Sequence, residues 1–241
     1  GLTASAEQYQ MWLNQNFNAV KNRYNMVTAY EINGELDITK FIRCTERIIN
    51  SYPQLNMTFY EENGVLKQRY RNTRLQVFEK KLHEIDCDSL SDMVQKIASM
   101  ELDMQYSQLS NFFILIGEHN TVFMWVIHHA VFDGLSKTIL LENIKNEYSG
   151  NDNTKNIGIN SYIDHVREND YREVNIDTEF WESYLKDAPK VGPFLPNYLL
   201  GEDQKSYAAL ESISIDEEQF KEVEDFAASK NISLFTCMLS I

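Results

Sequence analysis

The chain has 241 residues, 43% of which are hydrophobic, and a formal net charge of −14 at pH 7. This length allows one large globular domain or lobe, while the negative charge argues against a surface for nucleic acid or an anionic membrane. No apolar run approaches the length of a membrane span, and Cys44, Cys87 and Cys237 are widely spaced, so we expect a cytoplasmic chain with reduced thiols and no metal site.

The first part of the chain alternates helices and strands. The expected elements are a helix over residues 5–17, a strand over 24–32, a helix from 38 to about 51, and hairpin strands over 55–60 and 65–70. Asp37 can cap the second helix, and Pro53 ends it. The turn between the hairpin strands contains Asn63-Gly64, a pair typical of a tight turn.

The middle of the chain continues this pattern. We expect a strand over 75–82, a helix over 89–102, paired antiparallel strands over 111–116 and 121–128, and a helix over 135–148. In the last helix, Ile139, Leu140, Ile144 and Tyr148 are expected to point inward. Residues 150–156 are polar enough for an exposed loop. The pattern indicates an α+β fold with a mixed, mostly antiparallel sheet flanked by helices.

The last part of the chain is expected to be mostly helical. The predictions are helices over 162–167 and 178–185, an extended break over 191–196, a strand over 207–215, and an acidic helix from Asp216. We interpret Asp164 and His165 as structural residues within a helix, and His83 and His119 as surface residues, because no motif supports a further role for them.

Two adjacent histidines lie at the end of the predicted strand over 121–128. His128 and His129 are followed, after three residues, by Asp133 and Gly134. Successive side chains of a strand point to opposite faces, so we expect one imidazole in a packed layer and the other at an opening. A positioned imidazole can take a proton from a nucleophile, the aspartate can organise the loop, and the glycine can let the backbone turn and a substrate approach. This spacing favours catalysis over the alternative of two structural histidines.

The histidine signature resembles that of the condensation domains of nonribosomal peptide synthetases, among the chloramphenicol acetyltransferase-like acyltransferases. Other segments resemble this family in the same order along nearly the whole chain. They are the opening segment 2–12 with its Gln and Trp, the strand and turn at 24–37, the Tyr-x-Asp motif at 161–165, and the Trp-bearing segment 180–185. The resemblance implies a chloramphenicol acetyltransferase-like lobe.

The resemblance also implies a domain organisation. A condensation domain has two similar lobes in a V, with the active site at the cleft and the signature in the first lobe. We therefore expect residues 1–230 to form an N-terminal lobe and residues 231–241 to begin the connection to a C-terminal lobe elsewhere in a larger synthetase. A complete acetyltransferase is disfavoured, because in those enzymes the signature lies near the C-terminus, whereas more than 100 residues follow it here. An isolated lobe is expected to be inactive.

The reaction that the resemblance implies is amide formation. The amine of an aminoacyl thioester on a downstream carrier protein attacks an acyl or peptidyl thioester on an upstream carrier. His129 would be the general base or would position the amine, His128 and Asp133 would maintain the loop, and Gly134 would line the passage to the acceptor. The domain itself would bind no metal and no cofactor, since the carriers supply the phosphopantetheine arms. Carrier proteins and adjacent synthetase domains are therefore the expected partners.

One position departs from the family pattern, and other functions stay open. The family usually has an arginine where this chain has Asn56, which can offer Asp133 only a neutral hydrogen bond in place of an ion pair. The alternatives are an epimerisation domain, a coenzyme A-dependent acyltransferase, and a non-catalytic module that recruits a carrier protein. The intact histidine pair disfavours the last of these, whereas Asn56 supports it.

Overall fold

The computed structural model describes residues 1–17, 22–84, 87–151, 159–170, 175–187 and 214–239. The chain divides into two compact units, residues 1–180 and 181–241, and each is considered by itself. The predicted division after residue 230 stays a prediction. The predicted break over 191–196 lies outside the described residues, as does most of the predicted strand over 207–215.

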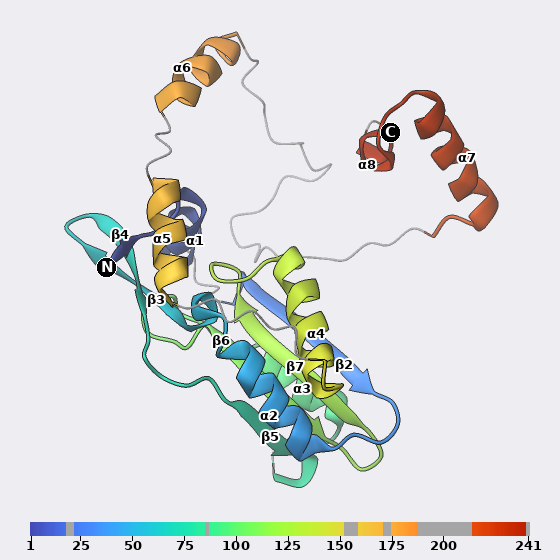
Figure 1. The fold of residues 1–241 in the computed structure, drawn as a ribbon. Helices are drawn as coiled ribbons and strands as arrows, with labels where there is room; N and C mark the ends of the chain where they lie inside the picture. The colour runs from blue at the N-terminus through green and yellow to red at the C-terminus, as the bar shows by residue number, and fades with distance from the viewer. Residues whose placement is uncertain (18–21, 85–86, 152–158, 171–174, 188–213, 240–241) are drawn as a thin grey trace, which may run out of the picture. The chain divides into compact units, whose positions relative to one another are not determined.

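A four-stranded sheet forms the centre of the first unit (Figure 1). Its strands lie in the order β2 (Asn25–Ile32), β7 (Thr121–His128), β6 (Ser110–Ile116) and β5 (Val77–Lys81). Strand β7 is antiparallel to both of its neighbours, whereas β5 runs parallel to β6. The predicted α+β class with a mixed, mostly antiparallel sheet is confirmed.

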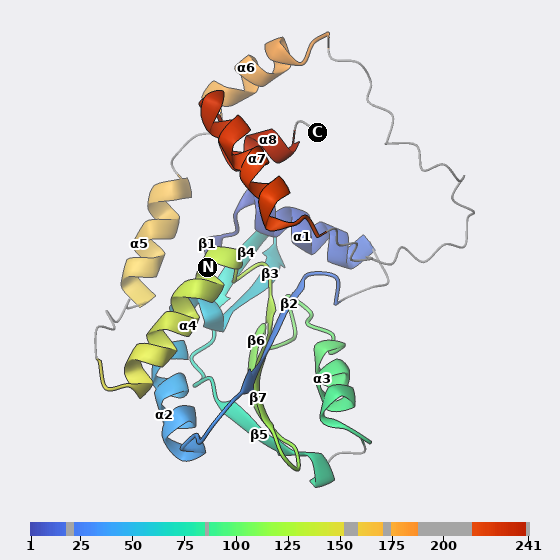
Figure 2. The same cartoon turned by 90° about the vertical axis from the view of Figure 1, so that its right-hand side faces the viewer.

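Helices cover both faces of this sheet, with α2 (Ile38–Ile49) and α4 (Gly134–Tyr148) on one face and α3 (Leu90–Ala98) on the other (Figure 2). Each helix begins with a side-chain cap, in which Asp37, Ser89 or Asp133 accepts a hydrogen bond from the backbone N–H three residues later. Because both faces are covered, residues 122–128 of β7 are all buried and nearly all apolar.

A smaller sheet completes the first unit, in the order β1 (Leu2–Thr3), β4 (Val65–Tyr70) and β3 (Met57–Glu62). The turn of the β3–β4 hairpin places Asn63 and Gly64 at positive φ, +54° and +77°, as the sequence pair predicts. Helix α1 (Ala6–Phe17) follows β1, and helix α5 (Ile159–Asp170) packs against β1 and the 3₁₀ helix η1 (Pro53–Asn56). A short 3₁₀ helix, η2 (Leu82–Glu84), follows β5.

Three local predictions need correction. The first hairpin strand begins at Met57, because Pro53 starts the η1 turn. Helix α3 ends at Ala98, since the chain beyond it leaves the helix and buries Leu102 in the core. Ile139 of α4 does not point into the core as predicted; it is 43% exposed, whereas Leu140 is 2% exposed.

The second unit contains α7 (Glu217–Ser229) and α8 (Leu234–Leu239), which contact each other. Asp216 caps α7 by accepting a hydrogen bond from the Gln219 N–H, as predicted for the acidic helix. Helix α6 (Asn175–Tyr184) crosses the boundary between the units. Within the described ranges, no helix has the length and apolar character needed to cross a membrane.

Candidate active site

Strand β7 ends at the histidine pair, and hydrogen bonds to two other segments fix its end. The His128 N–H donates to the Leu109 carbonyl at 2.8 Å, and the His129 N–H donates to the Tyr24 carbonyl at 2.8 Å. The His128 side chain is fully buried, whereas His129 is exposed and lines a hollow of about 380 Å³. The predicted division into one packed and one open imidazole is confirmed.

His128 has the surroundings of a structural residue. Its Nδ1 accepts a hydrogen bond from the Ala130 N–H at 3.1 Å. Its Nε2 lies 3.4 Å from the amide nitrogen of Gln15, which is also a hydrogen-bond donor. Burial, and after it the charge of His129, lowers the pKa of His128 to about 4. The ring is therefore neutral at physiological pH and binds the loop after β7 through the Ala130 N–H.

One ring nitrogen of His129 is hydrogen-bonded, and the other has no partner among the residues that the structure describes. Its Nδ1 lies 2.8 Å from the Phe132 carbonyl, which can only accept, so Nδ1 carries the proton in this contact. In the neutral ring, Nε2 is then an unprotonated acceptor. A carbonyl on Nδ1 orients an imidazole for base chemistry at Nε2. The hollow beside the ring is formed by the start of α1, the loop of residues 129–133, Gln54 and Tyr162.

Asp133 organises the loop by capping α4. Its carboxylate accepts a hydrogen bond from the Ser136 N–H at 2.7 Å. Hydrogen bonds from the side chain and the backbone of Ser136 lower the pKa of Asp133, so the carboxylate is charged at neutral pH. The expected organising role of this residue thus takes the form of a helix cap.

Gly134 does not turn the backbone as predicted. It is the first residue of α4 and has no positive φ, so the conformational freedom of glycine is not used here. A Cβ at this position would meet no atom within 4 Å, which leaves open space beside the helix start. This space is compatible with the expected approach of a substrate.

Two glutamines on α1 contact the segments around the histidine pair, and Gln15 has no counterpart among the predicted site residues. Gln8 donates from Nε2 to the Ala130 carbonyl at 2.9 Å. Gln15 donates to the Leu102 carbonyl at 2.7 Å and accepts from the Met104 N–H at 3.0 Å. The glutamines are seven residues apart, which places them on one helix face, and this spacing is the signal that the sequence offers.

Tyr162 of α5 lines the same hollow as His129 and also lies outside the predicted site residues. Its hydroxyl donates a hydrogen bond to Oε1 of Gln68 at 2.9 Å, which ties α5 to strand β4. Burial raises the pKa of Tyr162 to about 12, so the phenol is protonated and acts as a fixed wall.

The histidine pair, the capping aspartate and the antiparallel hairpin that carries them are features of one family, and the model of that family, "Condensation domain", matches residues 2–241. The chain belongs to the condensation-domain family. Two curated relatives are the nonribosomal peptide synthetase dtxS1 of Metarhizium robertsii, 23% identical over 191 residues, and bacitracin synthase 3 of Bacillus licheniformis, 32% identical over 139 residues. These matches cover 78% and 54% of this chain but 2% of each relative.

Solved structures of condensation domains share the fold. The starter condensation domain of rhizomide synthetase RzmA superposes with a TM-score of 0.65 and 16% identity, covering 78% of this chain and 48% of that chain. The four-domain synthetase holo-AB3403 superposes with a TM-score of 0.76 and 21% identity, covering 97% of this chain and 18% of that chain. The chain therefore spans about half of the starter condensation domain and a small part of the complete synthetases that it resembles.

The departure of this condensation-family chain at Asn56 has a structural consequence. The Asn56 side chain is buried and donates from Nδ2 to the carbonyls of Arg71, at 2.7 Å, and of Thr73. Its Oδ1 has no hydrogen-bond partner within the described parts of the chain. The neutral hydrogen bond to Asp133 that the resemblance suggested is therefore not formed, and Asn56 instead ties η1 to the end of β4.

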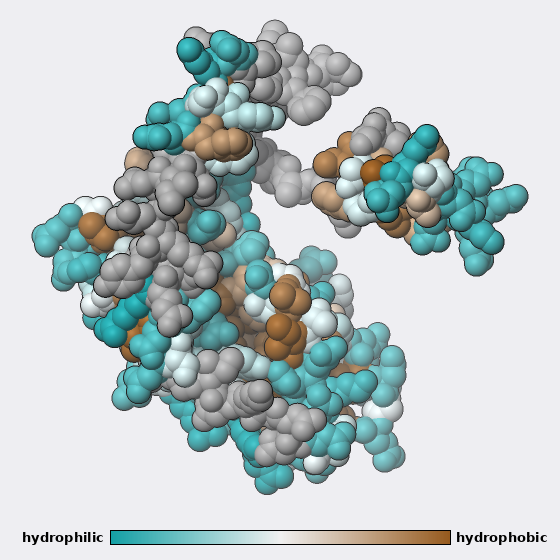
Figure 3. Space-filling model, turned by 45° about the horizontal axis from the view of Figure 1, so that its top comes forward, coloured by the Kyte–Doolittle hydropathy of each residue, from teal (hydrophilic) through white to brown (hydrophobic). Residues whose placement is uncertain are grey.

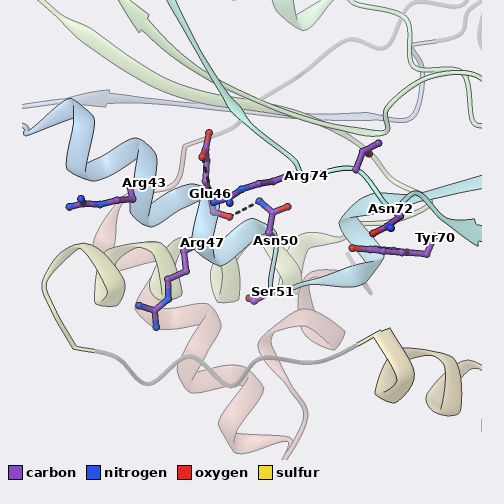
Figure 4. A pocket seen from close by; sticks show the side chains of 9 residues that line it. Arg43, Glu46, Arg47, Asn50, Ser51, Tyr70, Asn72 and Arg74 are labelled. Carbon is purple, nitrogen blue, oxygen red and sulfur yellow. Dashed lines mark hydrogen bonds and ion pairs between the residues drawn. The ribbon is translucent and has the colours of Figure 1, made fainter.

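A larger hollow of the condensation lobe, of about 780 Å³, lies between α2 and the segment after β4 (Figure 4). Arg43 and Arg47 extend from α2 in different directions, while Arg74 points toward Glu46 (Figure 4). Arg47 pairs with Glu147 at 3.0 Å, and Arg74 approaches Glu46 at 3.9 Å. None of the signature residues lines this hollow, so size alone does not make it the candidate active site.

Metal chemistry has no ready set of ligands in the described part of this condensation lobe. No group of three His, Cys, Asp or Glu side chains is placed there to hold a metal ion. Cys44, Cys87 and Cys237 are free thiols, and burial, followed by the charge of Glu147, raises the pKa of Cys44.

Proposed function

We propose that the native protein is a synthetase in which this lobe helps to form an amide bond between two carrier-bound substrates. The donor is an acyl or peptidyl thioester on an upstream carrier, and the acceptor is an aminoacyl amine on a downstream carrier. The observation that carries the proposal is His129, which is exposed and lines the hollow while its Nδ1 is bound to the Phe132 carbonyl, so that Nε2 is the acceptor of the neutral ring. Residues 1–230 would form the N-terminal lobe, and residues 231–241 would lead to a C-terminal lobe.

The proposed transfer forms one bond and breaks one bond, and it needs no reactant besides the two carrier-bound substrates. The amine nitrogen attacks the thioester carbonyl, the new C–N bond forms, and the C–S bond breaks to release the carrier thiol. His129 takes or steers the amine proton through Nε2, and the departing thiolate receives it. Holding two tethered substrates together supplies a large share of the acceleration, because proximity removes the entropic cost of their encounter. In this scheme His128 and Asp133 maintain the loop, and Gly134 borders the acceptor's path.

The partners and cofactors follow from this scheme. The phosphopantetheine arms belong to the carrier proteins, and the lobe itself needs no cofactor for the transfer. The relatives are synthetases, such as tyrocidine synthase 3 and bacitracin synthase 3, and this supports carriers and adjacent synthetase domains as partners. The chemistry would take place in the cytoplasm, where loaded carriers are available.

The test is a transfer assay on the complete native protein with separately loaded donor and acceptor carriers. Intact-protein mass spectrometry follows the acyl group, and amide formation predicts that its mass moves onto the acceptor carrier. Exchange of the donor's α-hydrogen with solvent, without transfer, would replace the proposal by epimerisation. Transfer from acyl-coenzyme A without a carrier would replace it by a free-standing acyltransferase, and carrier binding without any chemistry would leave a recruitment module.

A further inference from the structure

A second hollow, of about 240 Å³, opens beside the His129 hollow between η1 and the first half of α4. Three residues, Gln54, Phe132 and Ser136, line both hollows, so the two spaces are adjacent and share these side chains as walls. The remaining walls of the small hollow are Tyr52, Leu55, Ile139 and Leu140. A group bound in the small hollow would therefore lie next to the candidate base.

The walls of the small hollow are mostly apolar, with the Gln54 amide as a polar group, and the polar atoms of Tyr52 and Ser136 are bound elsewhere. The Tyr52 hydroxyl accepts a hydrogen bond from Asn143, which leaves its ring to form the wall. The Ser136 N–H binds Asp133 at 2.7 Å, and the Ser136 side chain also binds this carboxylate. Such a space favours an apolar group, and binding pockets in general combine apolar walls with a few polar groups.

One wall residue borders both the small hollow and solvent. The face of the molecule seen in Figure 3 is largely hydrophilic, with isolated hydrophobic patches. Ile139 is 43% exposed. Leu55, Phe132 and Leu140 are 2%, 5% and 2% exposed and belong to the core. Ile139 can therefore be replaced by a smaller or larger side chain with little disturbance of the core, and it sets the size of the hollow.

We infer that the small hollow is a specificity subsite for the apolar part of one of the two amide partners. The inference rests on the proposed function and deepens it. A volume of about 240 Å³ lies below the 300–1,000 Å³ of pockets for whole ligands, so the hollow fits a branched aliphatic side chain, an aromatic side chain or a short acyl tail. The polar thioester and amine remain in the His129 hollow, and Ile139 decides how large the apolar group can be.

The experiment measures substrate preference in the complete native protein with loaded carriers. Ile139→Trp fills the small hollow, and Ile139→Ala enlarges it. Leu135→Trp is the matched control, because Leu135 is on the same helix and 70% exposed but does not line the hollow. One series of substrates varies the donor acyl chain with a fixed acceptor, and a second varies the acceptor side chain with a fixed donor.

The expected result is a change in the ratio of kcat/KM between large and small apolar substrates in one of the two series. Ile139→Trp should lower this ratio about 10-fold or more, because one methylene in an apolar pocket already changes kcat/KM about 10- to 200-fold. Ile139→Ala should raise it, and Leu135→Trp should leave it as in the wild type. The series that responds identifies the bound partner.

The outcomes separate the subsite from the proposed function. Transfer by the wild type with unchanged ratios in both Ile139 variants would overturn the subsite and leave amide formation in place. An absence of transfer in the wild type would overturn the proposed function itself. If Ile139→Trp lowers the thermal unfolding midpoint far below that of the wild type, the subsite is tested by Ile139→Ala alone. An unchanged kcat/KM ratio between large and small substrates in Ile139→Ala would then overturn the subsite.

Discussion

The amide nitrogen of Gln15 lies 3.4 Å from Nε2 of His128. The orientation of the Gln15 amide is fixed by hydrogen bonds to two other residues. The Leu102 carbonyl and the Met104 N–H hold the two ends of the Gln15 amide at 2.7 and 3.0 Å. On its other side, His128 faces the Ala130 N–H. The Ala130 N–H occupies Nδ1, the one acceptor of the neutral ring, and a second proton there would break this hydrogen bond, which disfavours protonation.

Gln15→Ala should lower the free energy of unfolding by about 2–3 kcal/mol, because it leaves the buried Leu102 carbonyl and Met104 N–H without this partner. Asn16→Ala is the matched control, since Asn16 is the exposed neighbour on α1. Denaturant unfolding of the two variants and the wild type checks the prediction. Equal stability of all three proteins would show that the hydrogen bonds of Gln15 to Leu102 and Met104 do not stabilise the fold.

His128 should make stability depend on pH. Its pKa of about 4 in the folded state lies below the ordinary value of 6.5, so the unfolded chain binds more protons between these values. The stability from the neutral ring is complete above about pH 6.5 and is lost as the pH falls toward 4. Nearby Asp103 raises this pKa but does not outweigh burial.

The size of this pH effect on the unfolding free energy follows from the difference between the folded and unfolded pKa values of His128, at about 1.4 kcal/mol for each pKa unit. Between pH 7 and pH 4.5, the wild type should lose about 2 kcal/mol more unfolding free energy than His128→Asn, which does not titrate there. Denaturant unfolding at both pH values measures the difference, and carboxylates common to the two proteins cancel. Parallel losses in the two proteins would contradict a depressed pKa of His128.

Asp133 should act through its hydrogen bond to Ser136. Asp133→Ala removes the cap of α4 and should cost about 1 kcal/mol of unfolding free energy, whereas Asp133→Asn keeps an acceptor oxygen and should cost a few tenths. Thermal or denaturant unfolding distinguishes the two variants. If Asp133→Asn were as destabilising as Asp133→Ala, the negative charge and not the cap would be the stabilising feature.

Asn56→Asp should destabilise the lobe by about 3 kcal/mol at neutral pH. A buried carboxylate at this position would face the carbonyls of Arg71 and Thr73, which now accept hydrogen bonds from the Asn56 amide. Asn72→Asp is the control, because Asn72 is exposed in the same segment. The expected difference between the variants should shrink as the pH falls and the new carboxyl is protonated; two equally stable variants would refute the assigned role of Asn56.

The local features of the site could be predicted from the sequence. Strand alternation separates His128 from His129, and the expected loop-organising role of Asp133 proves to be a cap of α4, a position at which aspartate is common. Gln15 and Tyr162 could not be found in this way, because their contacts with His128 and Gln68 join residues 113 and 94 positions apart. Only tertiary packing brings such pairs together.

The wrong predictions have the same origin. Helical spacing groups Ile139 with Leu140, but the direction of the inward face of α4 depends on the neighbouring helix and on η1. The resemblance suggested Asp133 as the partner of Asn56, whereas the hairpin brings the carbonyls of Arg71 and Thr73 to the same amide. For Ile139 the helix was predicted well and its neighbours were not, whereas for Asn56 both the element and its neighbours differ from the prediction, since Asn56 lies in η1.

The most direct test of the central claim is the single-turnover rate of amide formation by the complete native protein, with both carriers loaded, for the wild type and His129→Ala. The account predicts a rate about 10²- to 10⁴-fold lower in His129→Ala, the usual contribution of a positioned acid-base group. His119→Ala, which removes an exposed histidine elsewhere, should keep the wild-type rate. Equal rates for the wild type and His129→Ala would contradict the account and remove His129 from the chemistry.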